Sequence, residues 1–186
     1  KLTNYIVSPA FRFNHLWDND RNYIIDKKNK NLKVLIALPI VIEDSIKILK
    51  LIDSAKLDND YKKIKFYIKS HPTNIEYMKN YIQNNCNNKF IYLEDSIYKI
   101  FKRINFLISG MSSVSLEGIA LNLPVIIIKS SSTLEYSTIP NHISKNLYKI
   151  CNNINDIKSS IKFFITKTKK ENIKSQKLSK SILINN

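Results

Sequence analysis

The sequence is poor in glycine, cysteine and arginine. It has two glycines and two cysteines, and only Arg12, Arg21 and Arg103 among its 30 basic residues are arginine. Two cysteines cannot form a four-cysteine zinc site or a disulfide framework, so we expect a reducing, cytoplasmic setting. With glycine at positions 110 and 118 alone, the chain has no GxGxxG motif and no GxxxxGKS/T phosphate loop. No apolar run approaches the roughly 20 residues that cross a bilayer, and no signal-peptide pattern begins the chain.

The chain is strongly basic, but its basic residues are almost all lysine. Its 186 residues carry a formal net charge of +15, and 44% are apolar, which is typical of a globular protein. A charge of this size is found in proteins that bind nucleic acid or anionic membranes. Arginine, however, is the usual side chain for bidentate contacts with bases, and abundant Lys, Ile and Asn reflect A/T-rich codons. We therefore expect no nucleic-acid partner, and we keep peripheral contact with the inner face of an anionic membrane as an expectation.

Short apolar segments alternate with amphipathic segments along the chain. Strands are predicted over 32–39, 64–69, 89–93, 105–109, 124–128 and 147–150, and helices over 43–55, 74–83, 95–103, 112–121, 154–164 and 171–184. Short apolar strands are typical of a parallel sheet that is buried on both faces. The alternation predicts an α/β fold, with a Rossmann-like, doubly wound parallel sheet of about six strands in three α/β/α layers.

The composition divides the chain into three regions. Residues 1–31 are irregular, and we expect them to form a hinge or linker. Residues 32–150 carry the alternating pattern and are expected to form one ligand-binding domain, while residues 151–186 are expected to be C-terminal helices that pack on it. Because the chain begins with Lys1 and not with Met, we expect it to be part of a longer protein.

The segment Lys69-Ser70-His71-Pro72 follows the second predicted strand. In an open parallel sheet, ligands bind at the carboxyl ends of the strands. Pro72 restricts His71 to extended backbone, so the imidazole is expected to project from the strand end, where it can donate a hydrogen bond to a phosphate oxygen. The alternative for His71 is a capping role in a helix-entry turn.

A second unusual segment, residues 109–118, reads Ser-Gly-Met-Ser-Ser-Val-Ser-Leu-Glu-Gly and joins the fourth predicted strand to a helix. Gly110 permits a tight or left-handed turn. Ser112 and Ser113 fall at the helix N-terminus, where free N–H groups and the helix dipole favour an anion. The alternative is an ordinary serine N-cap. Glu117 is expected either to reach a ribose hydroxyl or to lie on the surface, and Gly118 to permit close packing on the sheet.

Two further loops leave the same edge. Leu93-Glu94-Asp95-Ser96 follows the third predicted strand, and its backbone groups are candidates for contact with a nucleobase; a capped helix start is the simpler interpretation. Residues 129–138 are rich in Ser and Thr and carry Lys129. They are candidates for a loop that closes over a ligand, and a plain connector is the alternative.

These segments resemble the C-terminal, donor-nucleotide-binding half of GT-B glycosyltransferases. The similarity is to bacterial surface-polysaccharide enzymes of the polysialyltransferase-like and Kdo-transferase-like type. It rests on the Lys69–Pro72 segment, on the Ser109–Gly118 segment, and on Leu123-Pro124-Val125-Ile126. The segment Phe11-Arg12-Phe13 resembles the hinge that follows the acceptor-side domain in such proteins.

The resemblance implies specific roles for the residues that match. In these enzymes a His-Pro pair and a Ser-Ser pair hold the phosphate and ribose of a CMP-sugar donor. Carried over, the first pair is His71 with Pro72, the second is Ser112 with Ser113, and Glu117 is the acidic residue that meets the ribose. Gly110 and Lys69 would complete the nucleotide-binding set.

The implied activity is transfer of a sugar from a nucleotide sugar, with a CMP-sugar favoured, to a surface glycan or lipid-linked acceptor. His71 would act as the catalytic group that, with the serine pair, stabilises charge on the departing phosphate. A helix N-terminus can replace a divalent metal in this task, so we expect no metal and no cofactor. The N-terminal acceptor domain, which supplies the catalytic base in such enzymes, is missing from the chain. We therefore expect nucleotide binding with little or no turnover by these residues alone.

Three other functions remain open from the sequence. The chain could be a non-catalytic nucleotide-binding or partner-docking module, a UDP-sugar epimerase-like protein of the same architecture, or a basic RNA-binding domain. An epimerase would need additional carboxylates near the sugar, and few of the 15 acidic residues lie at strand ends.

Overall fold

The computed structural model describes residues 31–57, 63–87, 90–94, 96–101, 103–130 and 139–184. The predicted hinge over 1–31, including Phe11-Arg12-Phe13, therefore lies outside the described residues except for its last position. Most of the predicted closing loop, residues 131–138, lies outside them as well. In chain order the elements are β1 (Asn31–Ala37), α2 (Ile42–Ser54), β2 (Lys63–Lys69), η3 (Pro72–Asn74), α3 (Ile75–Asn85), β3 (Phe90–Tyr92), α4 (Ile97–Phe101), β4 (Phe106–Ser109), α5 (Ser113–Ala120), β5 (Val125–Ile128), β6 (Tyr148–Cys151), α6 (Ile154–Thr166) and α7 (Lys169–Ile184).

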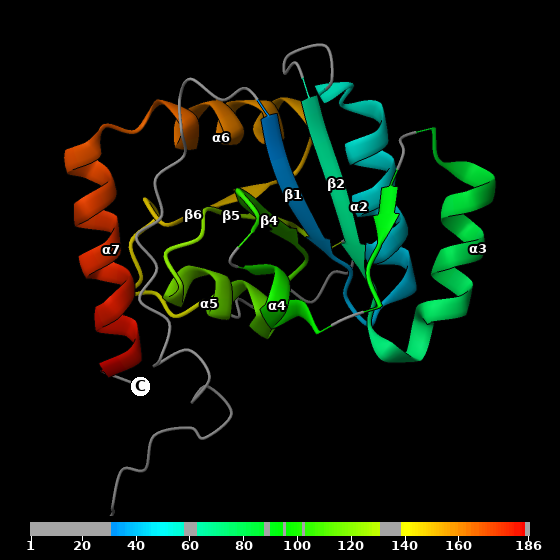
Figure 1. Cartoon of the computed structure of the whole chain (residues 1–186), viewed down its shortest axis with the longest axis horizontal. Coiled ribbons are helices and arrows are strands. Elements are labelled where there is room, and N and C mark those ends of the chain that lie inside the picture. The colour runs from blue at the N-terminus through cyan, green and yellow to red at the C-terminus, as the bar shows by residue number, and fades with distance from the viewer. Residues whose placement is uncertain are drawn as a thin grey trace, which may run out of the picture.

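The six strands form one parallel sheet in the order β3-β2-β1-β4-β5-β6 (Figure 1). From β1 the chain first moves outward to β2 and β3, and it then returns to β4 on the other side of β1. This reversal makes the space between β1 and β4 the topological switch point, where doubly wound sheets bind ligands. The predicted α/β fold, with its doubly wound parallel sheet and three layers, is confirmed.

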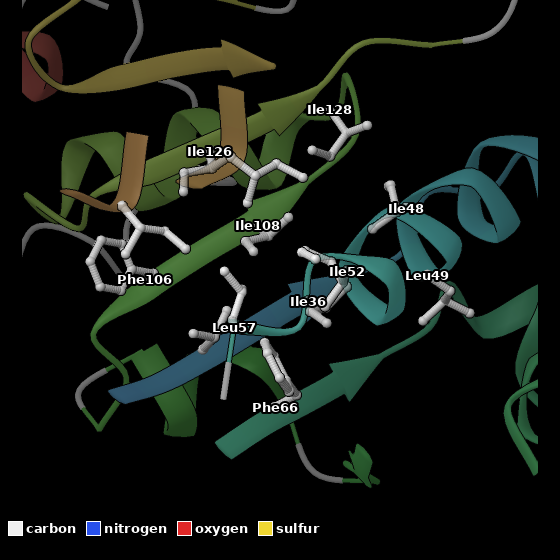
Figure 2. Packing of buried hydrophobic residues seen from close by; sticks show 14 of the residues in the cluster. Ile36, Ile48, Leu49, Ile52, Leu57, Phe66, Phe106, Ile108, Ile126 and Ile128 are labelled. Atoms are coloured by element: carbon white, nitrogen blue, oxygen red, sulfur yellow. The ribbon is translucent and has the colours of Figure 1, made fainter. Parts of the chain in front are cut away.

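Side chains alternate between two apolar layers because successive residues of a strand face opposite sides. Val34, Ile36 and Leu38 pack with α2, α3 and α6, whereas Leu35 and Ala37 pack with α4 and α5. Figure 2 shows the first layer, with Ile48 and Ile52 of α2 directed at Ile36 and Ile108 of the sheet. β4 and β5 are buried at every position, as expected for central strands of a parallel sheet.

The glycines act through close packing. Neither has a positive φ, so of the tight or left-handed turn expected at Gly110 the left-handed alternative is wrong. A Cβ atom there would instead lie 3.1 Å from Pro39 Cγ, so Gly110 lets the β1–α2 loop approach. At Gly118 a Cβ would lie 2.6 Å from Leu107 Cδ2, which confirms the predicted close packing of α5 on the sheet.

The helix boundaries differ from the predictions mainly near η3 and α4. The helix predicted from Asn74 is preceded by a 3-10 turn, because Pro72 fixes the first residue of that turn. The helix predicted over 95–103 is shorter, Ile97–Phe101. Among the described residues, no helix combines the length and apolar character that crossing a membrane requires.

Candidate functional site

Three strand ends lie level at one edge of the sheet. Ala37 of β1 pairs with Lys69 of β2 on one side and with Ser109 of β4 on the other. The segments that begin with Ser70 and with Gly110 therefore leave the sheet at the same height. Adjacent strands lie about 4.8 Å apart, so β2 and β4 flank β1 at a separation of roughly 10 Å. The two predicted motifs thus share one edge, on either side of the switch-point strand.

The β1–α2 loop, residues 38–41, connects the two motifs. Asn74 Nδ2 donates a hydrogen bond to the carbonyl oxygen of Ile40, which ties η3 to this loop. On the other side, Gly110 packs against Pro39. In the sequence, Asn74 is only the first residue of the helix predicted over 74–83, and its contact with Ile40 depends on how the strands are ordered.

His71 caps the short helix η3 through one nitrogen of its ring. It occupies the N-cap position of η3 with extended backbone (φ −60°, ψ 142°), as Pro72 predicts. Its Nδ1 accepts a hydrogen bond from the Thr73 backbone N–H at 3.4 Å and lies 2.8 Å from Thr73 Oγ1. Because a backbone N–H can only donate, the neutral imidazole carries its proton on Nε2. His71 therefore caps η3, while its role toward a phosphate stays a prediction.

The second motif begins α5. Ser112 is the N-cap residue and Ser113 is the first helical residue, as predicted. The first-turn N–H groups of a helix have no intrahelical acceptor and attract anions. α5 has no acidic residue in its first turn, whereas α2, which also starts at the switch point, has Glu43 and Asp44 there. The electrostatics therefore favour an anion at α5 over α2.

A buried hydroxyl pair supports the start of α5. Ser115 Oγ lies 2.7 Å from Ser109 Oγ and donates to the carbonyl oxygen of Gly110 at 3.2 Å. Both serines are fully buried. Ser115 was not predicted to be a site residue, although a serine among Val114, Leu116 and Ile119 indicates a buried polar contact.

Glu117 is buried within α5, with 4% of its surface exposed. The surface alternative for this residue is therefore wrong. A buried carboxylate is costly unless partners compensate it. Its alternative role, contact with a ribose, stays a prediction.

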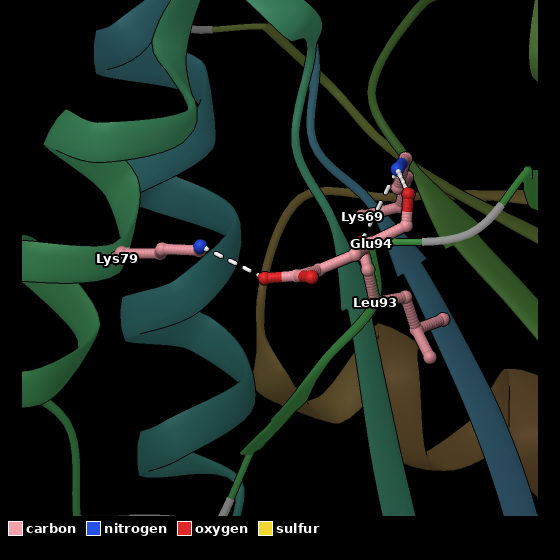
Figure 3. Close-up of polar contacts among 4 residues, drawn as sticks. All are labelled: Lys69, Lys79, Leu93 and Glu94. Atoms are coloured by element: carbon pink, nitrogen blue, oxygen red, sulfur yellow. Dashed lines mark hydrogen bonds and ion pairs between the residues drawn. The ribbon is translucent and has the colours of Figure 1, made fainter.

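The ammonium group of Lys69 contacts backbone carbonyl groups, and its nucleotide-binding role stays a prediction. Its Nζ donates to the carbonyl oxygens of Leu93 at 3.2 Å and Glu94 at 2.8 Å, in the segment that follows β3 (Figure 3). Ser70, the next residue, is 3% exposed, and its hydroxyl has no hydrogen-bond partner among the described residues.

The loop after β5 is anchored by α2 in the same manner. Lys47 Nζ donates to the carbonyl oxygens of Lys129 at 2.8 Å and Ser130 at 3.4 Å. Ser130 Oγ donates to Asp44 Oδ2 at 2.8 Å. Lys47 was not recognised from the sequence, because it reads as one lysine among 27 and its partners lie more than 80 positions away.

The described residues contain no group of three or more His, Cys, Asp or Glu side chains that could hold a metal ion. Two Asp-x-Asp sequences, at 18–20 and 58–60, lie outside these residues. Transfer without a metal therefore stays a prediction.

A cavity lies at the other end of the strands, where β5 and β6 begin. It lies against Leu147, Phe164, Lys167 and Ser175. Burial, and secondarily Lys149, lower the pKa of Lys167 from 10.5 to about 8. Lys167 Nζ donates to the carbonyl oxygen of Asn146 and to Ser175 Oγ, so its contacts join the α6–α7 corner to the segment before β6. This cavity is far from the predicted motifs in the topology of the sheet.

No family model matches the sequence, and no curated protein matches it. Solved structures share the fold at low sequence identity. UDP-GlcNAc 2-epimerase from Methanocaldococcus jannaschii, solved with UDP-GlcNAc and UDP, superposes with a TM-score of 0.56 at 15% identity. The superposition covers 86% of this chain and 46% of the epimerase, so the chain spans less than half the length of that protein.

Two single domains match over nearly their whole length. The C-terminal domain of a glycosyl transferase group 1 family protein (LpcC) from Francisella tularensis matches with a TM-score of 0.52 at 14% identity, over 95% of this chain and 93% of that domain. The catalytic domain of cholesterol-α-glucosyltransferase from Helicobacter pylori matches with a TM-score of 0.50 at 15% identity, over 82% of this chain and 99% of that one. The chain therefore has the fold found in domains of glycosyltransferases and of UDP-GlcNAc 2-epimerases.

Proposed function

We propose that this chain is the donor-nucleotide-binding half of a glycosyltransferase that uses a nucleotide sugar. The observation that carries the proposal is the level ending of β2, β1 and β4, which brings His71 and the N-terminus of α5 to one edge at the switch point. Domains of the same fold in the two glycosyltransferases above support it.

In this proposal the site acts through charge. Cleavage of a sugar–phosphate bond leaves negative charge on the departing nucleotide, and donors fixed in advance on that charge lower the barrier. The His71 Nε2–H and the first-turn N–H groups of α5, with the hydroxyls of Ser112 and Ser113, would be those donors. Pro72 and the Thr73 bond orient the imidazole, and Gly110 keeps the β1–α2 loop close. The buried carboxylate of Glu117 would accept from the ribose.

In this proposal, the acceptor-binding domain and the catalytic base lie outside this chain. A missing N-terminal domain would bind the glycan or lipid-linked acceptor and supply the base that deprotonates its hydroxyl. The net charge of +15 would favour peripheral contact with an anionic membrane on the cytoplasmic side. The family resemblance favours a CMP-sugar, whereas the M. jannaschii structure holds UDP-GlcNAc and UDP. The nucleobase that the site prefers is therefore the first property to measure.

The direct test is a thermal-shift and titration panel with CMP, CDP, UMP, UDP and GDP. A ligand at 100 times its dissociation constant adds about 2.7 kcal/mol of stability. We expect saturable binding of one nucleotide class, lost in His71→Ala and retained in the control His142→Ala, which changes an exposed histidine that precedes β6. Absence of binding by the wild-type chain would refute the proposal, and salt-sensitive RNA binding without nucleotide preference would favour the RNA-binding alternative.

His71→Asn separates the two roles of the imidazole. An asparagine oxygen can still accept from the Thr73 N–H, as N-cap residues do, but it lacks the Nε2–H. We expect His71→Asn to lose nucleotide binding while keeping the thermal stability of the wild type. If His71→Asn loses thermal stability as well as nucleotide binding, the result would assign His71 to capping alone.

A UDP-sugar epimerase is the second candidate, because several UDP-GlcNAc 2-epimerases share the fold with TM-scores of 0.50 to 0.56. Product formation from a UDP-sugar with no acceptor present would favour it. That assay needs the longer protein of which this chain is expected to be a part. If the chain is a non-catalytic nucleotide-binding module, it should bind a nucleotide in the titration panel. The longer protein should then show neither sugar transfer nor epimerisation.

A further inference from the structure

The backbone that follows β3 is held by one side chain of the neighbouring strand. Lys69 ends β2, and its ammonium group donates to two consecutive carbonyl oxygens, those of Leu93 and Glu94, at 3.2 and 2.8 Å (Figure 3). A lysine ammonium has three N–H donors, and these two contacts use two of them. Hydrogen bonds from a charged donor are stronger than those between neutral groups. The contact therefore fixes the direction of the chain as it leaves the edge strand.

Two other contacts of Leu93 and Glu94 are described. The Leu93 N–H donates to the carbonyl oxygen of Ile68 at 2.8 Å and so extends the pairing of β3 with β2 by one residue. The Glu94 carboxylate pairs with Lys79 of α3 at 3.2 Å, but the Glu94 side chain is 84% exposed. Exposed ion pairs contribute little, and this one acts on the Glu94 side chain, whereas the Lys69 bonds act on the carbonyl groups themselves.

This segment lies at the edge that carries the candidate site. Lys69 is in register with Ala37, and the chain continues from it through Ser70 to His71. A nucleotide whose phosphate lies between His71 and α5 can reach the β3 side of that edge with its base. There, backbone groups whose direction is fixed can distinguish one base from another, because unpaired polar groups of the wrong base are penalised.

We propose that Lys69 is a positioning residue which fixes the Leu93–Glu94 backbone and thereby sets the base preference of the site. The base-setting part rests on the proposed function, whereas the fixing of the backbone does not. The charge of Lys69 acts on protein carbonyls and not directly on the phosphate.

The test compares Lys69→Met with Lys69→Arg, which retains the donors, and with Lys65→Met, which removes an exposed lysine from the same strand. In ligand-free protein, amide hydrogen exchange across residues 91–97 should become about tenfold faster in Lys69→Met and stay within twofold of wild type in the other two variants. Unchanged exchange in Lys69→Met would overturn the proposal. Equal acceleration in Lys65→Met would overturn it as well.

Binding measurements test the base-setting part. In Lys69→Met, affinities for UMP and CMP should fall and their ratio should approach one, while the affinity for inorganic pyrophosphate stays within twofold of wild type. A loss of pyrophosphate affinity as large as the nucleotide loss would overturn the positioning role, because it would make Lys69 a phosphate ligand. If the wild-type chain binds no nucleotide, the proposed function and the base-setting role both fail, and the exchange result still decides whether Lys69 fixes the backbone.

Discussion

The hydroxyl groups of Ser109 and Ser115 lie 2.7 Å apart in the interior, between the end of β4 and the first turn of α5. Ser115 donates its one proton to the carbonyl oxygen of Gly110, so Ser109 is the donor within the pair. These two bonds connect the end of β4 and the turn at Gly110 to the first turn of α5.

Ser115→Ala should lower the free energy of unfolding by about 1–2 kcal/mol, because it leaves the buried Ser109 hydroxyl and Gly110 carbonyl without this partner. Urea denaturation measures the change. The double variant Ser109→Ala with Ser115→Ala should lose less than the sum of the two single losses, because removing both hydroxyls leaves fewer unsatisfied groups. Strictly additive losses would show that the two hydroxyls do not interact.

Gly118→Val should destabilise the protein by roughly 2–3 kcal/mol or more. Its Cβ would lie 2.6 Å from Leu107 Cδ2 and 3.1 Å from Val125 Cγ2, and the branched side chain adds two further atoms there. The denaturant midpoint reports the loss. The comparison variant Asn122→Ala lies just beyond α5 at a position with positive φ, and it should cost only about 1 kcal/mol. Wild-type stability in Gly118→Val would contradict the close packing of α5 on the sheet.

Stability should rise with pH between about 8 and 10.5 through Lys167. Burial, with a smaller effect of Lys149, lowers the pKa of this amine from 10.5 to about 8, so in this range the unfolded chain binds more protons than the folded one. Below pH 8 both states are protonated, and the contribution is constant. We expect the free energy of unfolding of the wild type to increase relative to Lys167→Met from pH 7.5 to 10. Parallel pH profiles of the two proteins would show that Lys167 titrates alike in both states.

Both thiols should react slowly in the folded protein. Burial, with Asp53 as a smaller cause, raises the pKa of Cys86 from 9.0 to about 11, and burial also raises the pKa of Cys151 to about 11. At pH 8 a rise of two pKa units lowers the thiolate fraction about a hundredfold. Iodoacetamide should therefore modify both at least tenfold more slowly than in urea, with Cys151 slower because it is fully buried. Rapid native labelling of Cys151 would contradict its burial.

The parts of the fold that depend on local pattern could be predicted. Six short apolar segments became the six strands, and the order of strand and helix along the chain implied parallel crossovers. Ser112 at a helix start and Pro72 after an extended His71 also follow from local preferences, and the structure has both. At Gly110 the left-handed turn did not form, and the residue instead gives room to Pro39 of the β1–α2 loop, which is far away in the sequence.

Only the sequence motifs of the candidate site could be predicted, and not the contacts that connect them. That His71 and the serine pair lie on the same edge of the sheet follows from strand topology. The roles of Lys47, Lys69 and Asn74 do not, because each bonds a carbonyl oxygen that lies 24 to 83 positions away in the chain. A backbone carbonyl carries no residue identity, so no sequence motif marks it as the partner of a particular lysine or asparagine.

Periodicity and turn chemistry act over a few neighbouring residues, so the layered α/β architecture and the motifs at the strand ends could be predicted from local pattern. The tertiary structure alone decided that β1 lies between β2 and β4, that Glu117 is buried, and that Lys69 holds the chain after β3. These depend on which strands pair and on how helices pack across the sheet, and both are set by contacts between segments far apart in the chain.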